Sequence, residues 1–512
     1  MRSYRRFSSG ILKEFFCVEF YMFFDRKAGV LLHIASLPSE YGIGDLGYSA
    51  FRFIDFLSEA GISLWQVLPI GPTSPAFYNS PYHSLSLFAG NYIFISPEKL
   101  FEKGYIKDRS ELSHQIGSDK IDYDFVYRYK RYLLMKAYEE SHRRVKSSGR
   151  FDFFCERNSF WLEDYALLQA IRTEGGREWH QCDEDIKLRK NIRNLKDSMR
   201  EQIEFFKFEQ FIFFEQWDEL RKYAKSKGVL IIGDVPIYPS YDSCDVWCNP
   251  EIFKLDINLV PKYVAGVPPD FFSETGQLWG NPLYDWEKLE STNFEFWARR
   301  LEFYSSIYDI IRLDHFRGFI AFWEVPFGEK TAVNGRWCKV PSEKFFKRVL
   351  GIISRERIIV EDLGFITEDV KYIRDKFGFA GMKVLEFAFY DKNSEYLPHN
   401  YSANSACYIG THDNPPAIAW FRSLDDRTKN NFFSYIGRKI DESQVSWEMI
   451  RLAFSSVSKF AIIQMQDFIG SDARMNTPGT KEGNWLWKIP YNFEYGDLAQ
   501  KIRSLCQTYG RL

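Results

Sequence analysis

The sequence predicts an α/β protein, a (β/α)8 barrel of the TIM type with large inserted subdomains. Eight short apolar runs recur along the chain, and such continuous runs are typical of strands buried on both faces in a parallel sheet. Helical patterns lie between several of these runs. Three of the runs end in carboxylates, at the strand ends where a barrel of this type places its chemistry. A doubly wound parallel sheet is the structural alternative.

The predicted strands and helices alternate along the chain. Amphipathic helices are predicted over 49–60, which Gly61 stops, and over 201–227, which ends at Gly228 and leads into the third strand. Thr367 can cap a third helix that ends at Gly378, so that 358–387 forms one βαβ unit. The predicted strands cover 31–37, 64–70, 229–236, 310–315, 358–363, 382–387, 406–413 and 460–467.

The spacing of the strands predicts the domain organisation. The gaps after the second and third strands are far longer than barrel loops need, which predicts inserted subdomains at about 71–228 and 237–309. Both follow strand carboxyl ends and should form walls around the active-site face. We expect residues 27–512 to form the catalytic barrel and residues 1–26 a non-catalytic extension. Its apolar part is too short and interrupted for a membrane helix, and it lacks a clear signal-peptide cleavage site.

Composition narrows the function classes. The net charge of -2 gives no indication of a nucleic-acid or membrane partner. The 18% aromatic content suits sugar stacking, although most of the 48 Phe are expected to fill the core. The eight Cys are scattered, and the closest pair, Cys244 and Cys248, has no His or second Cys pair nearby. We therefore expect reduced thiols in a cytoplasmic protein, with a plastid as the alternative location, and no zinc site at these cysteines. No phosphate-binding glycine loop is evident in the sequence.

Three carboxylates end predicted strands: Asp314, Glu361 and Asp413. Each alone could simply cap the following helix, but three at one barrel face suit chemistry that needs carboxylates in different protonation states. Arg312 lies two residues before Asp314, so both side chains share one strand face, and an Arg there would hold an ionised, oriented nucleophile. A purely structural ion pair is the alternative. His412 and His315 could instead be metal ligands together with the nearby acids, which we discount because sugar chemistry explains the acids.

Turn-rich loops carry the candidate ligand contacts. The segments 266–270, 278–286 and 474–485 combine Gly and Pro with Trp, Asn and Asp, the residue types of a sugar subsite. Ordinary ordered loops are the alternative for each.

The sequence resembles 4-α-glucanotransferase, also called amylomaltase or disproportionating enzyme, of glycoside hydrolase family 77 in the α-amylase clan. The resemblance extends from about Lys27 to near the C-terminus. The motifs that carry it are LLHIASLPS (31–39), YGIGDLG (41–47), SPY (80–82), GDVP (233–236), VAGVPPD (264–270), WGNPLYDW (279–286), RLDHFRG (312–318), EDLG (361–364), THDN (411–414) and ARMNTPGTKEGNW (473–485).

The resemblance implies a barrel with inserted subdomains and no separate C-terminal β-domain. It also implies Asp314 as nucleophile, Glu361 as general acid/base and Asp413 as transition-state stabiliser. The implied substrate-binding residues are Arg312, His412, Tyr82, Asp234, Trp279, His315 and Asn484. Pro415 and Pro416 depart from the family pattern, which leaves the shape of the loop after Asp413 open.

The implied activity is retaining transfer of α-1,4-glucan segments to the 4-hydroxyl of an acceptor glucan or glucose. The expected partners are maltodextrins and fragments of glycogen or starch. No metal or organic cofactor is expected to take part. A hydrolase of the same clan and a non-catalytic glucan-binding protein are the alternatives.

Overall fold

The computed structural model describes residues 26–112, 119–269, 273–364, 366–493 and 497–512. Residues 1–25 of the expected extension and Asp270 of the 266–270 loop lie outside them. The predicted division into an N-terminal extension and a barrel with inserted subdomains stays a prediction.

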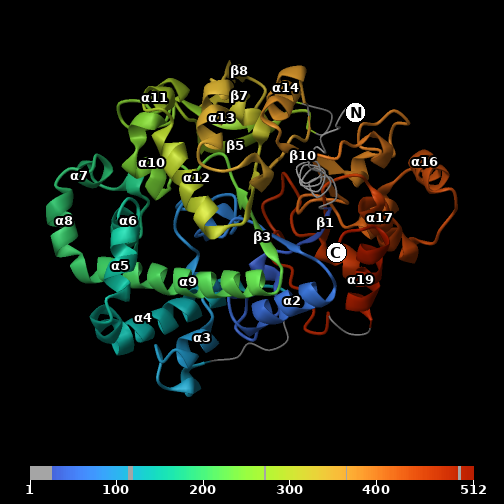
Figure 1. Ribbon diagram of the computed structural model, residues 1–512. Helices are drawn as coiled ribbons and strands as arrows, with labels where there is room; N and C mark the ends of the chain where they lie inside the picture. The colour runs from blue at the N-terminus through green and yellow to red at the C-terminus, as the bar shows by residue number, and fades with distance from the viewer. Residues whose placement is uncertain (1–25, 113–118, 270–272, 365, 494–496) are drawn as a thin grey trace, which may run out of the picture.

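Eight parallel strands close into a barrel at the centre of the molecule, in the order β1-β12-β11-β10-β9-β6-β3-β2 (Figure 1). The closure confirms the predicted (β/α)8 barrel and excludes the doubly wound sheet, which has open edges. The strands are β1 (Lys27–Leu31), β2 (Leu64–Val67), β3 (Leu230–Val235), β6 (Ile310–Leu313), β9 (Ile358–Val360), β10 (Ala380–Val384), β11 (Ser405–Tyr408) and β12 (Phe460–Gln464).

Side chains fill the barrel, as continuous apolar strands require. Ile232, Ile359 and Ile462 belong to its buried interior cluster. The Tyr408 hydroxyl donates to Gln66 Oε1 at 2.7 Å, so these two buried polar side chains satisfy each other. A second, larger cluster lies between the strands and the surrounding helices.

Helices surround the barrel and extend it. Those associated with the barrel are α2 (Tyr48–Glu59), α12 (Glu295–Ile307), α13 (Ser342–Leu350), α14 (Glu368–Phe377), α15 (Ala417–Ser423), α16 (Asp426–Ile436), α17 (Val445–Ser455), α18 (Met465–Ile469) and α19 (Leu498–Thr508). The Thr367 hydroxyl bonds the Asp369 carboxylate and makes no side-chain cap, so the predicted capping role of Thr367 is wrong although the helix begins where expected.

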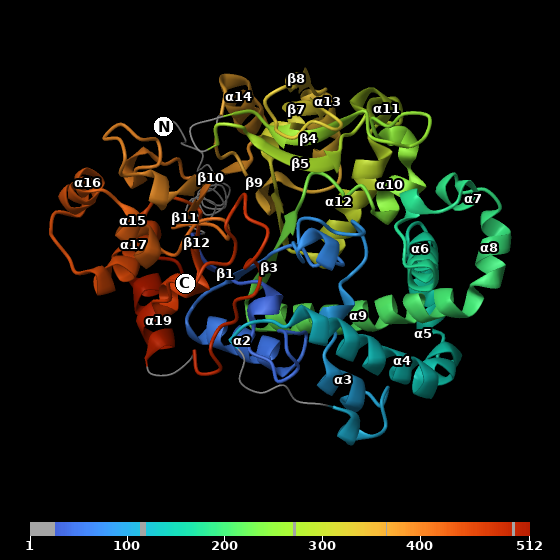
Figure 2. The ribbon, with the colours of Figure 1, turned by 180° about the vertical axis from the view of Figure 1, so that it is seen from behind.

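The chain between β2 and β3 forms a helical lobe beside the barrel. Its helices are α3 (Pro97–Glu102), α4 (Tyr123–Ser147), α5 (Arg150–Arg157), α6 (Leu162–Gly175), α7 (Glu184–Lys187), α8 (Ile192–Ser198) and α9 (Arg200–Ser226). Helix α9 runs from this lobe back along the barrel and leads into β3 (Figures 1 and 2).

A four-stranded antiparallel sheet with the order β5-β4-β7-β8 lies above the barrel in Figure 1. Its strands are β4 (Tyr263–Val267), β5 (Gln277–Pro282), β7 (Ala321–Pro326) and β8 (Arg336–Lys339), near α10 (Cys244–Cys248) and α11 (Trp286–Ser291). Strands β7 and β8 come after β6, so the segment after the fourth barrel strand also contributes to this layer. Sequence analysis placed insertions only after the second and third strands and missed this segment.

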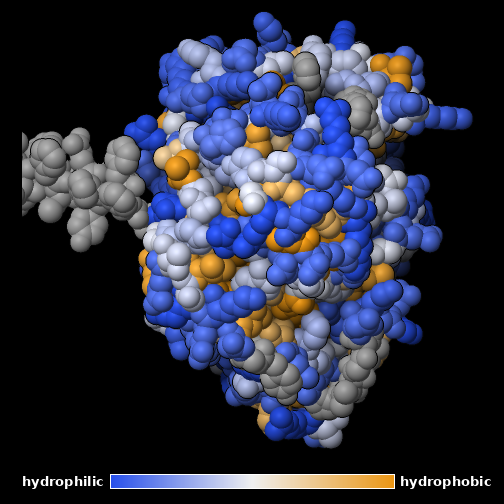
Figure 3. Space-filling model, turned by 90° about the vertical axis from the view of Figure 1, so that its right-hand side faces the viewer, coloured by the Kyte–Doolittle hydropathy of each residue, from blue (hydrophilic) through white to orange (hydrophobic). Residues whose placement is uncertain are grey.

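One face of the molecule is largely hydrophilic (Figure 3). In Figure 3, charged and polar residues cover most of the visible side, and hydrophobic residues gather in small groups between them. Among the residues that the structure describes, no helix is both long and apolar enough to cross a membrane.

Candidate active site

The three predicted carboxylates follow the carboxyl ends of barrel strands. Asp314 comes directly after β6, Glu361 directly after β9, and Asp413 lies in the loop after β11. Because all eight strands are parallel, these ends meet at one face of the barrel. The structure thus brings together the residues that the sequence selected.

Arg312 connects two carboxylates at this face. It pairs with Asp234 in the register between β6 and β3, and its guanidinium donates to both Asp234 oxygens at 2.7 Å. The same group donates to Asp314 Oδ1 at 2.8 Å. Arg312 is only 4% exposed, and burial raises the pKa of Asp234 although Arg312 opposes the shift. The Arg312 guanidinium therefore pairs with the buried Asp234 carboxylate and at the same time orients the Asp314 carboxylate.

Tyr82 joins this pair to His412. The Tyr82 hydroxyl donates to Asp234 Oδ2 at 2.8 Å and lies 3.4 Å from His412 Nδ1. The two rings stack with centroids 5.0 Å apart and planes at 19°. Tyr82 comes from the long segment after β2, so this insertion supplies one side of the site.

Glu361 is held by backbone groups. Its Oε2 accepts the N–H of His315 at 2.8 Å, and its Oε1 accepts the N–H of Leu363 at 2.9 Å. Burial, followed by the nearby Asp314 carboxylate, raises the pKa of Glu361 to about 8. The carboxyl group therefore keeps its proton at neutral pH, as a general acid must.

Asp413 is held in the opposite protonation state. Its Oδ1 accepts from Asn476 Nδ2 at 2.6 Å and lies 3.4 Å from His412 Nε2. Burial raises the pKa of Asp413, but His412 and Asn476 outweigh that effect and lower the pKa to about 2. Arg474 also donates to the Asp413 carbonyl oxygen.

The loop after Asp413 accommodates its two prolines. Asn414 Oδ1 accepts from the Thr411 N–H at 3.0 Å and from the Thr411 hydroxyl at 2.9 Å, which closes the turn before the prolines. Pro416 then directly precedes α15, where its fixed φ angle suits a helix start. The departure from the family pattern leaves Asp413 beside the cavity.

A cavity of about 330 Å³ opens at this face. Six predicted site residues line it: Tyr82, Trp279, Asp314, His412, Asp413 and Asn484. Glu361, Arg312, Asp234 and His315 are not among the lining residues. Arg312 donates to Asp314, Asp234 accepts from Tyr82, His315 contacts Trp279, and Glu361 accepts the His315 N–H beside Asp314. Tyr78, Tyr238 and Trp485 add aromatic faces, which suit the stacking of sugar rings.

Three predicted contact residues have partners within the protein. The Trp279 and His315 rings meet edge to face with centroids 4.7 Å apart, and burial lowers the pKa of His315 to about 4. Asn484 accepts from the Thr477 N–H at 2.9 Å and donates to the Thr480 carbonyl and hydroxyl oxygens at 3.1 Å. The Asn484 amide therefore shapes the loop that lines the cavity.

Asn476 is the site residue that sequence analysis failed to single out. It lies in the 474–485 loop that the sequence marked as a candidate, but no local pattern tells which amide in that loop reaches Asp413. Among the described residues, neither His315 nor His412 belongs to a group of three or more potential metal ligands.

A closed parallel barrel with several carboxylates at its carboxyl face and an aromatic-lined cavity defines a carbohydrate-active barrel enzyme. The family model for 4-alpha-glucanotransferase matches residues 32–493. The chain belongs to this family. It transfers α-glucan segments from a donor to an acceptor and retains the anomeric configuration. The family match and the closed barrel confirm the predicted family, fold and activity.

Relatives from several organisms are similar to this protein over nearly its whole length. A 4-alpha-glucanotransferase of Aquifex aeolicus is 51% identical over 95% of this chain and 99% of its own. One of Clostridium butyricum is 44% identical over 94% of this chain and 100% of its own. The structure of an amylomaltase from Streptococcus agalactiae in complex with acarbose superposes with a TM-score of 0.91 at 36% identity, over 95% of this chain and 99% of that one.

Proposed function

We propose that Asp314 is the nucleophile, Glu361 the general acid and base, and Asp413 the stabiliser of the transition state in glucan transfer. The observation that carries this proposal is geometric: the three carboxylates follow strand carboxyl ends at one face of the barrel, where Arg312 holds Asp314 and the His315 N–H holds Glu361. The opposite directions of two pKa shifts support the division of roles. The pKa of Glu361 is raised to about 8 and that of Asp413 is lowered to about 2. Carboxyl groups whose pKa values are pushed apart in this way suit acid–base and electrostatic roles, respectively.

In the first step, an Asp314 oxygen attacks the anomeric carbon of an α-1,4-linked glucose unit. Glu361 gives its proton to the leaving glycosidic oxygen, and a β-linked glucosyl ester forms on Asp314. The Arg312 guanidinium at 2.8 Å supports the orientation of Asp314 for this attack. Retaining enzymes of this kind need the two carboxyl groups about 5–5.5 Å apart.

In the second step, the ionised Glu361 takes the proton of an acceptor 4-hydroxyl. That oxygen attacks the same carbon, the bond to Asp314 breaks, and the α-linkage is restored. Asp413 and His412 would stabilise the positive charge that develops on the sugar through contacts that are strongest in the transition state.

The remaining predicted residues would hold the donor and the acceptor. Trp279 and Tyr82 offer aromatic faces to the cavity, where His315 contacts Trp279 and Asp234 accepts from Tyr82. Asn484 lines the cavity itself and shapes its loop through Thr477. Transfer outruns hydrolysis when water is excluded from the ester or when an acceptor is bound well. We propose maltodextrins derived from glycogen or starch as donor and acceptor.

The free thiols of the described cysteines support the proposed cytoplasmic location, because oxidising compartments favour disulfides. The expectation that nucleic acids and membranes are not partners stays a prediction that rests on the net charge of -2.

Incubation with maltotriose tests the proposed reaction. A transferase releases glucose and builds longer oligomers, whereas a hydrolase yields glucose and maltose alone, and a binding protein yields no products. Asp314→Asn should abolish the oligomer ladder. The matched control is Asp309→Asn, at the other end of the same strand, where the carboxylate accepts the Ile231 N–H at 2.9 Å. This control should keep the ladder.

A further inference from the structure

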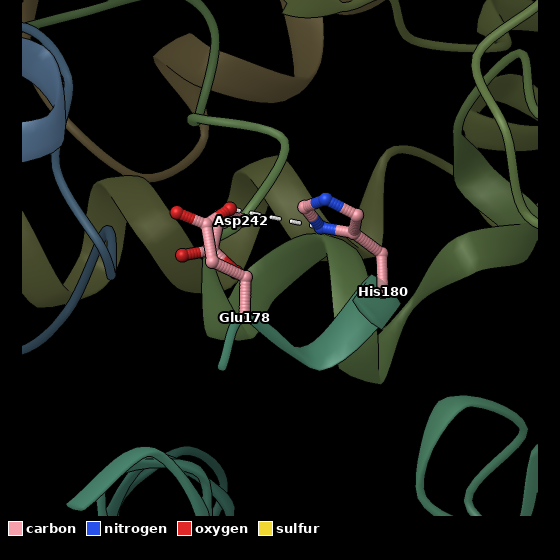
Figure 4. A group of neighbouring side chains, drawn as sticks. All are labelled: Glu178, His180 and Asp242. Atoms are coloured by element: carbon pink, nitrogen blue, oxygen red, sulfur yellow. Dashed lines mark ion pairs between the residues drawn. The ribbon is translucent and has the colours of Figure 1, made fainter. Parts of the chain in front are cut away.

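Three potential metal ligands meet in the wall between the helical lobe and the barrel, outside the active site. Glu178 and His180 lie at the short 3-10 helix η5 (Trp179–Gln181), and Asp242 lies in the segment after β3. One ligand atom from each residue lies within 4.8 Å of the other two. Figure 4 shows the carboxyl groups of Glu178 and Asp242 side by side, with the imidazole ring of His180 opposite them.

Asp242 has a buried oxygen that no N–H or alcohol group of the described residues satisfies. The residue is 3% exposed, and its Oδ2 and backbone carbonyl accept from Arg172 on α6. Its Oδ1 has no N–H or alcohol donor among the described residues, and the Glu178 carboxyl is a hydrogen-bond partner for Asp242 only when it carries a proton that a metal ion would replace. Leaving a charged oxygen buried without a partner costs more free energy than a single ordinary hydrogen bond returns.

His180 presents a second unsatisfied atom to the same place. Its Nδ1 is buried, has no hydrogen-bond partner among the described residues, and lies 3.8 Å from Glu178 Oε2. That separation is too long for a hydrogen bond. An imidazole nitrogen and two carboxylate oxygens thus face one another, and Arg172 is the cation that pairs with Asp242 there.

We propose that Glu178, His180 and Asp242 bind a divalent first-row transition-metal ion, with zinc as the ion that the ligand set fits best. Zinc takes mixed nitrogen and oxygen ligands at about 2.0–2.2 Å, which puts the ligand atoms about 3–4 Å from one another. Ligand atoms that already lie within 4.8 Å reach this geometry through small side-chain rotations. Calcium and magnesium prefer all-oxygen sites of six or more ligands.

Arg172 supports this site from outside. It holds one Asp242 oxygen and so directs the other toward the ion, as outer partners of metal-bound carboxylates do. The Trp179 indole N–H donates to the Tyr241 carbonyl oxygen at 3.1 Å, which already fixes η5 against the segment after β3. An ion here would fasten the helical lobe to this segment, whose Tyr238 lines the active-site cavity. It takes no part in the transfer chemistry.

Metal binding can be measured directly on the full chain. Protein stripped with a chelator is titrated with zinc by calorimetry, and its unfolding temperature is recorded with and without zinc. We expect one zinc per chain, a higher unfolding temperature with zinc, and neither effect with magnesium or calcium. The absence of saturable zinc binding would overturn the proposal.

Variants locate the site. His180→Ala and Glu178→Gln alter partly exposed side chains and should each weaken zinc binding at least about tenfold, the loss that removal of an outer partner already causes. The matched control is His142→Ala, because His142 lies 3.6 Å from Glu204 without the second carboxylate and should bind zinc as the wild type does. Equal zinc binding by all three variants would refute the proposal. The zinc would then lie elsewhere, for example at Cys244 and Cys248, whose sulfurs are 3.5 Å apart.

Discussion

Glu361 accepts the backbone N–H of His315 at 2.8 Å, and His315 is the residue that directly follows Asp314. The proposed acid/base is thereby fixed to the end of the strand that carries the proposed nucleophile. His315 has a φ of 50°, a left-handed conformation that turns the chain at this point. A backbone contact of this kind holds the Glu361 carboxyl group in place without depending on the rotamer of another side chain.

The pH dependence of donor turnover follows from Glu361. Its raised pKa means that the proton needed for the first step is present below about pH 8 and is lost above it. We expect kcat/KM for a maltodextrin to fall tenfold per pH unit well above pH 8. Glu361→Gln should lose roughly 10²- to 10⁴-fold in kcat/KM for maltodextrin. An α-maltosyl fluoride needs no acid to release its leaving group, so turnover of this donor by the variant should not fall above pH 8. A fall in turnover above pH 8 that persists in this variant would contradict the assignment of Glu361 as the general acid.

Arg312 should support both stability and catalysis. Arg312→Gln leaves the buried Asp234 carboxylate unpaired, so we expect the free energy of unfolding to fall by about 3–5 kcal/mol. The loss of orientation at Asp314 should also lower kcat. Arg422→Gln removes solvent-exposed ion pairs with Glu442 and Asp472 and should leave the free energy of unfolding nearly unchanged. Denaturant unfolding compares the two variants, and equal small effects would show that Arg312 carries no special role.

Two asparagines of the same loop should differ in their kinetic effects. Asn476→Ala removes a hydrogen bond to the Asp413 carboxylate and should lower kcat roughly 10- to 100-fold. Asn484→Ala loosens the loop through Thr477 and Thr480 and should mainly raise KM. Steady-state kinetics with maltotriose separate the two, and a KM effect alone for Asn476→Ala would exclude a transition-state role for it.

A buried carboxyl group behind the site should make the stability depend on pH. Burial raises the pKa of Asp467 to about 7, and Asp467 Oδ1 accepts the Ala417 N–H at 2.7 Å. The folded state holds this proton more tightly than the unfolded chain, whose Asp pKa is about 3.9. This contribution to the free energy of unfolding is therefore full below about pH 4 and is lost as the pH rises to about 7.

Asp467→Asn tests that dependence. Between pH 4 and pH 7, the titration of Asp467 should lower the free energy of unfolding of the wild type by on the order of 4 kcal/mol. The variant should not show this decrease. Chemical unfolding at a series of pH values measures the difference between the two proteins. Parallel curves for the two would mean that Asp467 titrates normally in the folded state.

The sequence predicted the barrel and the positions of its carboxylates because both depend on local patterns. Buried parallel strands appear as apolar runs, and Asp314 and Glu361 directly follow two such runs. The pairing of β4 with β7 was missed because it joins segments on opposite sides of β6, and no local period encodes such a contact. The contacts of Tyr82 with Asp234 and His412 likewise arise only when the insertion after β2 packs over the barrel.

The central claim is that Asp314 carries the glucan as a covalent ester. Glu361→Gln treated with an α-maltosyl fluoride should form this ester and then hydrolyse it slowly, because the general base of the second step is missing. Peptide mass spectrometry after rapid quenching should find one maltosyl group on the peptide that contains Asp314. A label on Asp413 or on another residue, or a label that persists in the double variant with Asp314→Asn, would contradict the account.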